Sequence, residues 1–277
     1  MTIQDRATEF HRLHAPGRLL LLPNCWDAGS ARLLASLGAD AIATSSAALA
    51  WAHGYPDGEC LPRARLVDTV AEITRIVDQP VTVDIERGYG ASPAEVADTV
   101  SALIGAGAIG INIEDGDRDP ADLVHRIEAA RTAAERQGVR LFINARTDLW
   151  LEPLVSDDAR LSEAIARGRR NAAAGADGFF VPRLSDPEAI RQIAAAVPLR
   201  VSLMAVPDLP GAATLRGLGV ARVSLGVMTL LKAFGSLEAP LRAFLDEGRL
   251  APMFEGSPSF AAIDGLFSSP SRPSEAR

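Results

Sequence analysis

Short apolar segments alternate along the chain with longer amphipathic segments, and this alternation limits the possible folds more than any other feature. Eight apolar segments have the length and composition of buried strands: 19–22, 41–46, 81–86, 110–115, 141–146, 178–183, 200–204 and 222–226. Glycine-containing triplets such as 38–40 and 175–177 end a helix just before a strand, as αβ loops require. The pattern predicts a (β/α)8 TIM barrel. An open doubly wound sheet would need a glycine-rich first turn, and residues 24–27 do not form one.

Two predicted helical segments flank the barrel. Residues 1–15 have the pattern of a short leading helix, and residues 239–250 form a further amphipathic segment after the last strand. We expect one barrel domain with its C-terminal helices over residues 1–267, followed by a mobile tail rich in serine and proline over residues 268–277. The length of 277 residues agrees with this, because α/β barrels of this size form a single domain.

The composition argues against several classes of protein. The formal net charge is −7 and no basic stripe is present, so nucleic acid is not expected as a partner. No apolar run reaches the roughly 18 residues of a membrane-spanning helix. Residues 1–14 carry charges throughout and lack the apolar centre of a signal peptide. Cys25 and Cys60 have no metal-type spacing, and we expect free thiols in a reducing cytoplasm.

Two carboxylates stand at the end of the third predicted strand. Apolar and polar residues alternate over 81–86, so Asp84 and Glu86 are expected to project from the same face. Adjacent acids repel each other, and each is costly to leave unpaired away from bulk water. A divalent cation would relieve this repulsion, and oxygen ligands of this kind suit Mg²⁺. The segment therefore predicts a Mg²⁺ site at the carboxyl end of the strand.

Further polar side chains are expected at the same end of the barrel, where the active sites of such barrels lie. They end or follow neighbouring strands: Trp26, Ser45, Ser46, Glu114, Arg146 and Arg183. Glu114 and Arg146 could simply form an internal ion pair between adjacent strands. Together with Asp84 and Glu86, however, they favour a site for a metal and an anion.

Several short motifs occur in an order that is typical of one enzyme superfamily. They are NCWDAGSAR at 24–32, SS at 45–46, GYPDG at 54–58, DIERGYG at 84–90, IED at 113–115 and ARTD at 145–148. Together they resemble the isocitrate lyase/phosphoenolpyruvate mutase superfamily, from about residue 19 to residue 235. The resemblance implies a (β/α)8 barrel, Mg²⁺ as the cofactor, and a small 2-oxo acid such as oxaloacetate, pyruvate or 2-oxoglutarate as the substrate. It also implies a homodimer or homotetramer in which a final helix is exchanged between subunits.

The resemblance assigns the metal site to three acids. Asp84 matches the principal metal-site acid, and Glu86 stands where many members of the superfamily have a second Asp. Glu114 matches a third acid that often acts through water. In the same resemblance Mg²⁺ is chelated by the 2-oxo acid, which stabilises a developing enolate oxygen.

The resemblance also assigns the substrate site. Ser45 and Ser46 match a segment whose backbone amides and hydroxyl hold the substrate carboxylate and 2-oxo group, and Trp26 is a further substrate-binding candidate. Asp57 matches an acid that follows Tyr-Pro, and Arg146 matches the substrate arginine of the fifth strand. An arginine fork binds a carboxylate in bidentate fashion. The expected catalytic residues are Asp57, Glu114 and Arg146.

The chain departs from the superfamily pattern just after Glu114. Lyases there carry a Lys-x-Cys-Gly-His loop whose Cys acts as acid and base, whereas this chain has Asp115-Gly116-Asp117-Arg118-Asp119-Pro120. The loop rich in Lys, Asn and Ser of the mutases and phosphonopyruvate hydrolases is also missing. Cleavage of isocitrate or methylisocitrate by the usual mechanism is therefore not expected. The chain's one lysine, Lys232, follows the last strand, which argues against a Schiff-base aldolase.

Three functions remain open. The primary hypothesis is Mg²⁺-dependent decarboxylation or C–C cleavage of an oxaloacetate-like acid, because decarboxylation needs no strong base. The alternatives are hydrolysis or rearrangement of a P–C bond as in phosphonopyruvate, and binding of a 2-oxo acid without catalysis. Candidate proton carriers and contacts for the distal end of the substrate are His53, Tyr55, Tyr89, Asn112, Asn144 and Arg183.

Overall fold

The computed structural model describes residues 1–268, and nine parallel strands form one sheet in the order β1-β9-β8-β7-β6-β5-β4-β3-β2. The strands are β1 (Leu20–Leu22), β2 (Asn24–Cys25), β3 (Ile42–Thr44), β4 (Val81–Asp84), β5 (Gly110–Glu114), β6 (Phe142–Arg146), β7 (Gly178–Val181), β8 (Arg200–Met204) and β9 (Val220–Ser224). The α-helices are α1 (Ile3–Leu13), α2 (Ala28–Ser36), α3 (Ser46–Ala52), α4 (Arg63–Ile76), α5 (Pro93–Gly105), α6 (Pro120–Arg136), α7 (Asp157–Ala173), α8 (Pro187–Ala196), α9 (Ala212–Gly217), α10 (Met228–Glu247) and α11 (Phe260–Ser268). The 3-10 helix η1 (Ala251–Met253) lies between the last two. The tail predicted over 268–277 begins at the last residue of α11 and otherwise lies outside the described residues.

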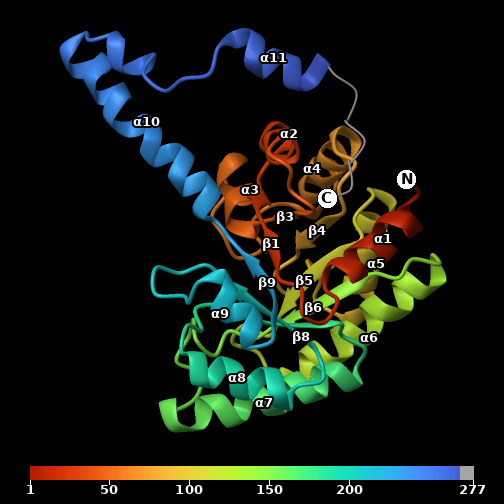
Figure 1. Cartoon of the computed structure of the whole chain (residues 1–277). Helices are drawn as coiled ribbons and strands as arrows, with labels where there is room; N and C mark the ends of the chain where they lie inside the picture. The colour runs from red at the N-terminus through yellow and green to blue at the C-terminus, as the bar shows by residue number, and fades with distance from the viewer. Residues whose placement is uncertain (269–277) are drawn as a thin grey trace.

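The two outer members of the sheet, β1 and β2, are parts of one strand interrupted at Pro23. Leu20 of β1 pairs with Arg222 of β9, and Cys25 of β2 pairs with Thr44 of β3. Proline has no N–H to donate, which explains the break in the ladder. The interrupted strand brings the ends of the sheet together, so eight strands form a nearly closed parallel barrel with helices around it (Figure 1). The predicted (β/α)8 fold is confirmed.

Five strands end earlier than predicted, β5 by one residue and β3, β4, β7 and β9 by two, although the strand-like pattern continues in the sequence. β3 ends at Thr44 because Ser45 is the N-cap of α3, a helix that the pattern did not predict. β4 ends at Asp84, and Glu86 has a φ of 51° in the left-handed region. β7 ends at Val181, and Arg183 likewise has a φ of 63°. The period-2 argument for Asp84 and Glu86 is therefore wrong, since the backbone has left the sheet before Glu86.

Helix α1 packs against the amino-terminal ends of two strands. A capping box fixes its start, with the Thr2 side chain accepting from Asp5 N. Buried Phe10 meets Phe142 at the start of β6 edge to face, with ring centroids 5.3 Å apart. Gly110 at the start of β5 has no Cβ, and a Cβ there would lie 3.2 Å from the Phe10 ring. The predicted leading helix is therefore present and closely packed on the barrel.

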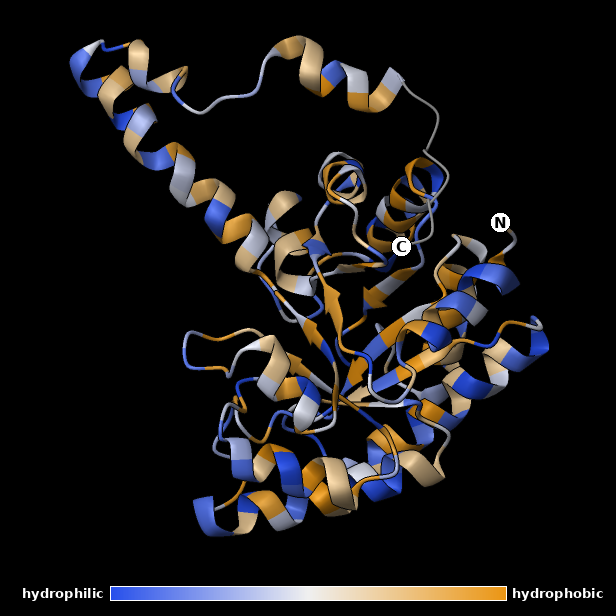
Figure 2. Ribbon diagram, viewed as in Figure 1, coloured by the Kyte–Doolittle hydropathy of each residue, from blue (hydrophilic) through white to orange (hydrophobic). Residues whose placement is uncertain are grey.

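The chain after the barrel forms helices α10 and α11, which present apolar side chains to solvent. Figure 1 shows α10 leaving the barrel, and Figure 2 shows apolar residues along both helices. α10 begins eleven positions before the predicted segment, and Pro240 lies inside it. Its exposed large apolar residues are Met228, Leu231, Phe234, Leu237, Leu241, Phe244 and Leu245. Within residues 1–268 no helix is long and apolar enough to cross a membrane.

His14, which follows α1, is buried at the amino-terminal end of the barrel. Its Nδ1 donates to the Phe10 carbonyl at 2.8 Å, and its ring stacks on Phe142 with centroids 4.2 Å apart. Burial, with Arg222 and Arg200 nearby, lowers the pKa of His14 to about 3. The folded protein therefore keeps this imidazole neutral at pH values where an unfolded chain would protonate it.

This difference predicts that stability falls as the pH drops below about 6.5, because the unfolded state then binds a proton that the folded state does not. The contribution of His14 is about 1.4 kcal/mol per pH unit, or about 2 kcal/mol between pH 6.5 and 5. Urea unfolding of the wild type and of His14→Gln at pH 7.5 and 5.0 measures it, since the other titrating groups are common to both proteins. The wild type should lose about 2 kcal/mol more than the variant. An equal loss in the two proteins would contradict the prediction.

Candidate active site

The candidate site lies at the carboxyl ends of three adjacent strands. Asp84 is the last residue of β4, Glu114 the last of β5 and Arg146 the last of β6. The register of β5 with β6 pairs Glu114 with Arg146 directly. Asp84 of β4 pairs with Asn112, which lies two residues before Glu114 on β5. The three charged side chains predicted from separate strands therefore meet at one end of the barrel.

Arg146 is the central group of this cluster. Its Nε and Nη2 donate to the two oxygens of Asp148 at 2.6 and 3.2 Å, and its Nη1 lies 2.5 Å from Glu114 Oε2. Burial alone would lower the pKa of Arg146, but Glu114, Asp148 and Asp84 raise it above its ordinary value. The ion pair considered from the sequence is thus present, and it is part of a larger set. Asp148 was missed as a partner, although its position two residues after Arg146 at a strand end was the available signal.

Asp84 is held by groups from the neighbouring strand and helix. The Ser46 hydroxyl lies 3.3 Å from Asp84 Oδ2, and the Asp84 N–H donates to Thr44 Oγ1 at 3.0 Å. Burial raises the pKa of Asp84, Arg146 lowers it, and Asp57 raises it further. Burial also raises the pKa of Glu114 well above its ordinary value, against the effect of Arg146. The acids are therefore crowded and short of positive charge.

Glu86 faces the loop that carries Asp57. Its Oε2 accepts from Glu59 N at 2.6 Å, and its Oε1 accepts from the Tyr89 hydroxyl at 3.1 Å. Glu59 Oε1 in turn accepts from Tyr89 N at 2.6 Å. Glu86, Glu59 and Tyr89 all have positive φ, which is strained for residues other than glycine. Burial, together with Asp84 and Asp57, raises the pKa of Glu86 to about 7.

The remaining predicted substrate residues follow the carboxyl ends of β2 and β3. Ser45 and Ser46 are buried at the start of α3, next to Asp84. Trp26 is half-buried just after β2, and its backbone N–H donates to Ser30 Oγ at 3.0 Å. Asp57 is exposed, and its charge acts on both Asp84 and Glu86.

The donor set fits a cation that is held largely by water. Within residues 1–268, no group of three or more His, Cys, Asp and Glu side chains is arranged to hold a metal ion by itself. Glu114 Oε2 is nevertheless buried and accepts no aligned hydrogen bond from the described residues, despite its ion pair with Arg146. Mg²⁺ is commonly bound through one or two carboxylates and several waters. The carboxylates of Asp84, Glu86 and Glu114, which influence one another's charge, suit that kind of coordination.

Comparison with known proteins places the chain in a family. The sequence model of the phosphoenolpyruvate phosphomutase family matches residues 10–245. The chain belongs to this family. It is thereby a member of the isocitrate lyase/phosphoenolpyruvate mutase superfamily, as its motifs predicted, and an enzyme of that type.

Similar proteins within the superfamily carry different functional names. A solved structure from Burkholderia cenocepacia J2315 with a provisional phosphonomutase assignment is 47% identical, with a TM-score of 0.82 over 86% of this chain and 99% of that one. An uncharacterized protein of Mycobacterium tuberculosis (strain ATCC 25618 / H37Rv) is 38% identical over 223 residues, 78% of this chain and 81% of the relative. Oxaloacetate decarboxylase of Pseudomonas entomophila (strain L48) is 31% identical over 223 residues, 78% of this chain and 76% of that protein. Family membership therefore leaves the reaction open.

The loop after Glu114 is short in this family member, as predicted. β5 ends at Glu114 and α6 begins at Pro120, which leaves residues 115–119 between them. The Asp115 side chain points into the protein, where Oδ1 accepts from Asp148 N at 3.0 Å and Oδ2 from Arg167 Nη1 at 2.8 Å. Through Asp115, the loop therefore connects the Asp148 backbone to Arg167 of α7.

Several candidates for the proton carrier and for the distal contacts have other partners. Asn144 Nδ2 donates to Asn112 Oδ1 at 2.9 Å, and Arg222 Nη2 donates to the same oxygen at 3.0 Å, all inside the barrel. The structure thus brings the two asparagines together below the site. His53 Nε2 donates to Thr69 Oγ1 at 2.9 Å. The buried Arg222 was missed, since its contacts join residues far apart in the sequence.

We expect Arg167→Met to destabilise the fold by about 3 kcal/mol, because it leaves the buried Asp115 carboxylate without its cation. Arg170→Met is the matched control on the same helix. Arg170 also contacts Glu163, but its side chain is 48% exposed, compared with 7% for Arg167. The control should change the free energy of unfolding by no more than about 0.5 kcal/mol. Urea unfolding at pH 7.5 measures both, and similar values would refute the bracing role.

Proposed function

We propose that this protein is a Mg²⁺-dependent lyase that breaks a carbon–carbon bond beside the carbonyl of a small 2-oxo dicarboxylate. Decarboxylation of an oxaloacetate-like acid is the specific reaction that we favour. The observation that carries the proposal is the Arg146 fork, 17% exposed, held among acids at the mouth of the barrel. The similarity to an oxaloacetate decarboxylase at 31% identity supports the choice of substrate.

Arg146 would bind a carboxylate of the substrate. A guanidinium has five N–H donors. Nε and Nη2 each donate one hydrogen bond to Asp148, and Nη1 forms an ion pair with Glu114 without an aligned hydrogen bond. One N–H on each Nη remains for the substrate, which is the geometry for bidentate recognition of a carboxylate. Asp148 and Glu114 hold the fork in place before the substrate arrives. Ser45 and Ser46, beside Asp84, are placed to orient the other end of the 2-oxo acid group.

The acidic residues of the site would hold the cation that binds the 2-oxo group. Asp84 would hold Mg²⁺ directly, with Glu86 and Glu114 acting through water, and the cation when bound supplies the positive charge that stabilises the developing enolate oxygen. Decarboxylation breaks the bond to the leaving carboxylate, releases CO₂ and leaves a carbon that takes up one proton. No strong base is needed, which agrees with a loop over 115–119 that has no Cys. Asp57, on the exposed loop next to Glu86, is our candidate for returning the proton.

We expect Asp84→Asn to lower kcat/KM for oxaloacetate decarboxylation by about 100-fold or more, since metal stabilisation of this kind contributes several kcal/mol. Pyruvate formation is followed with lactate dehydrogenase and NADH, and the rate with Mg²⁺ but no protein is subtracted. Asp78→Asn removes the same charge from an exposed position and should retain wild-type activity. EDTA should abolish turnover by the wild type. Turnover that survives in Asp84→Asn, or a wild type that is inactive on a panel of 2-oxo acids with Mg²⁺, would refute the proposal.

Phosphonate chemistry is the second candidate, because the family match and the 47% identical structure both carry phosphomutase-type names. Phosphorus-31 spectra of phosphonopyruvate incubated with the protein and Mg²⁺ decide this point. New phosphate or phosphoenolpyruvate signals would favour it over decarboxylation. Calorimetric binding of 2-oxoglutarate or oxaloacetate, with no product from any of these substrates, would instead indicate a binding protein.

We also infer that the protein is a homodimer or homotetramer whose C-terminal helices are exchanged between subunits. The support is the row of exposed apolar residues on α10, with Phe234 54% and Leu245 74% exposed, and the further exposed Phe254 and Phe260 after it. Contiguous exposed apolar surface of this kind favours an interface. A second copy of the chain is the occupant that the superfamily resemblance implies.

Phe234→Asp combined with Leu241→Asp should therefore shift the protein towards the monomer mass in size-exclusion chromatography with light scattering. The two residues lie seven apart, on one face of α10. Ala239→Asp adds a charge about 200° around the same helix from Leu241, and it should leave the oligomer intact. A wild type that is monomeric, or an oligomer that survives the double change, would contradict the inference.

A further inference from the structure

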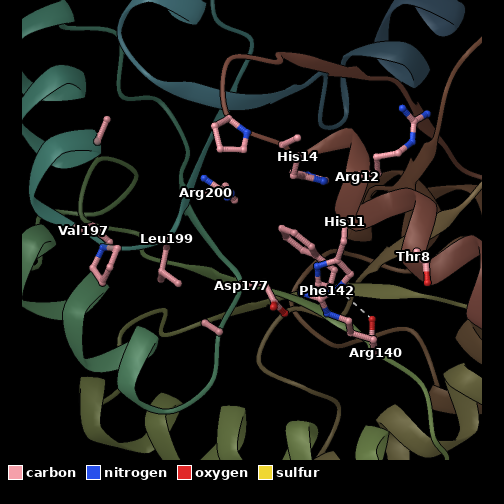
Figure 3. Close-up of a pocket in the computed structure, with 15 residues that line it drawn as sticks. Thr8, His11, Arg12, His14, Arg140, Phe142, Asp177, Val197, Leu199 and Arg200 are labelled. Carbon is pink, nitrogen blue, oxygen red and sulfur yellow. Dashed lines mark hydrogen bonds between the residues drawn. The ribbon is translucent and has the colours of Figure 1, made fainter.

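A cavity of about 800 Å³ lies at the amino-terminal end of the barrel. It is formed between α1 and the segments that lead into β6, β7 and β8, and Figure 3 shows the side chains that line it. Phe142 lines this cavity, whereas Arg146 belongs to the candidate active site, and these are the first and last residues of β6. The cavity and the candidate active site are thus at opposite ends of the same strand.

The charged groups of the cavity leave it with net positive charge. Arg140 precedes β6 and Arg200 begins β8; within residues 1–268, neither side chain has a hydrogen bond or ion pair. The other charged groups are neutralised: Arg12 pairs with Glu9 at 2.6 Å, and Asp177 pairs with Arg131 at 2.5 Å and also accepts from Ile143 N. His11 Nε2 is hydrogen-bonded to the Arg140 carbonyl oxygen at 3.1 Å. Arg140 and Arg200 are therefore the cations left for a ligand.

His14 adds a buried acceptor to the same cavity. It lines the cavity and is 1% exposed, and its Nε2 has no hydrogen-bond partner in the described part of the chain. Because Nδ1–H donates to the Phe10 carbonyl, the neutral ring presents a lone pair at Nε2. A buried acceptor without a donor costs about 1–3 kcal/mol. In Figure 3, His14 and Arg200 lie on facing sides of the cavity.

Arg200 pairs through Gly178 of β7 with Asn144 of β6, four residues beyond Arg140. The two arginines therefore stand about 16 Å apart at the backbone, and their side chains must extend towards each other to reach one anion from two sides. Val197, Pro198 and Leu199 supply an apolar wall beside them.

We propose that this cavity binds a small phosphate monoester that carries a hydroxyl group. The phosphate would lie between Arg140 and Arg200, and the hydroxyl would donate to His14 Nε2. This proposal does not depend on the reaction at the other end of the barrel.

Isothermal titration calorimetry with glycerol 3-phosphate on the full chain tests the site. The wild type should bind it, and Arg140→Gln/Arg200→Gln should bind it at least about tenfold more weakly, because charge-assisted hydrogen bonds are lost. Arg136→Gln/Arg216→Gln removes the same charge from exposed positions outside the cavity and should bind as the wild type does. Arg146→Gln should also bind normally. Thermal unfolding without ligand verifies that each variant is folded.

His14 is tested with a second ligand. Methyl phosphate has the phosphate group but no hydroxyl on its carbon, so the wild type should prefer glycerol 3-phosphate by about fivefold or more, the value of one hydrogen bond. His14→Phe keeps the aromatic packing and should lose this preference while still binding methyl phosphate. Succinate serves as a dicarboxylate probe on the Arg146→Gln background.

The proposal is overturned by any of four results. These are no binding of glycerol 3-phosphate by the wild type at millimolar concentration, loss of binding in Arg146→Gln, equal weakening by the two double variants, and tighter binding of succinate than of the phosphate ester. A preference for glycerol 3-phosphate that persists in His14→Phe overturns the assigned role of His14.

Discussion

The burial of Arg146 among carboxylates is the interaction on which the carboxyl end of the barrel depends. Asp84, Glu114 and Asp148 come from three separate segments, and burial raises the pKa of Asp84 and of Glu114, so both are expensive to ionise without a nearby cation. One guanidinium contacts two of them directly and acts on the third at longer range. The ends of β4, β5 and β6 are therefore tied together by charge as well as by the strand ladder. In the proposed reaction, a carboxylate substrate would enter a site whose cation is already fixed.

The two sides of this cluster are built differently. On the β5 side, the five residues after Glu114 place Asp115 inside the protein, where Arg167 of α7 neutralises it and the Asp148 N–H binds it. On the β4 side, the turn after Asp84 is held in positive-φ conformations by hydrogen bonds between Glu86, Glu59 and Tyr89. Backbone strain of this sort persists only where surrounding contacts fix it, and it gathers at functional sites. The side that carries Asp57 is thus the strained side of the site.

Sequence patterns predicted the framework because strand and helix periodicity and glycine punctuation are local signals. They were sufficient for eight strands, for the end of the barrel that carries Asp84, Glu114 and Arg146, and for the short loop after Glu114. They failed at Glu86, whose alternation with Asp84 resembles a strand although its φ is 51°. Arg167 was not predicted either, since its partner Asp115 lies 52 positions away and nothing in the sequence joins them. Local pattern specifies elements, whereas ion pairs between distant segments depend on the assembled barrel.

The barrel interior links the two ends of the molecule through a buried charge. Arg222 of β9 is fully buried, and its Nε and Nη1 have no hydrogen-bond partner among residues 1–268. Burial lowers the pKa of Arg222 to about 10, and Asp84 acts in the opposite direction. Such a group is a poor source of stability, because apolar residues of similar volume often replace buried ions without loss. The electrostatic effect of Arg222 on its surroundings is a better explanation for its presence. Arg222 lies beneath Asp84 and offsets the negative charge of that carboxylate, and it also helps to keep His14 neutral. The negative charge at the mouth is therefore partly offset from two directions, by Arg146 beside the acids and by Arg222 beneath them.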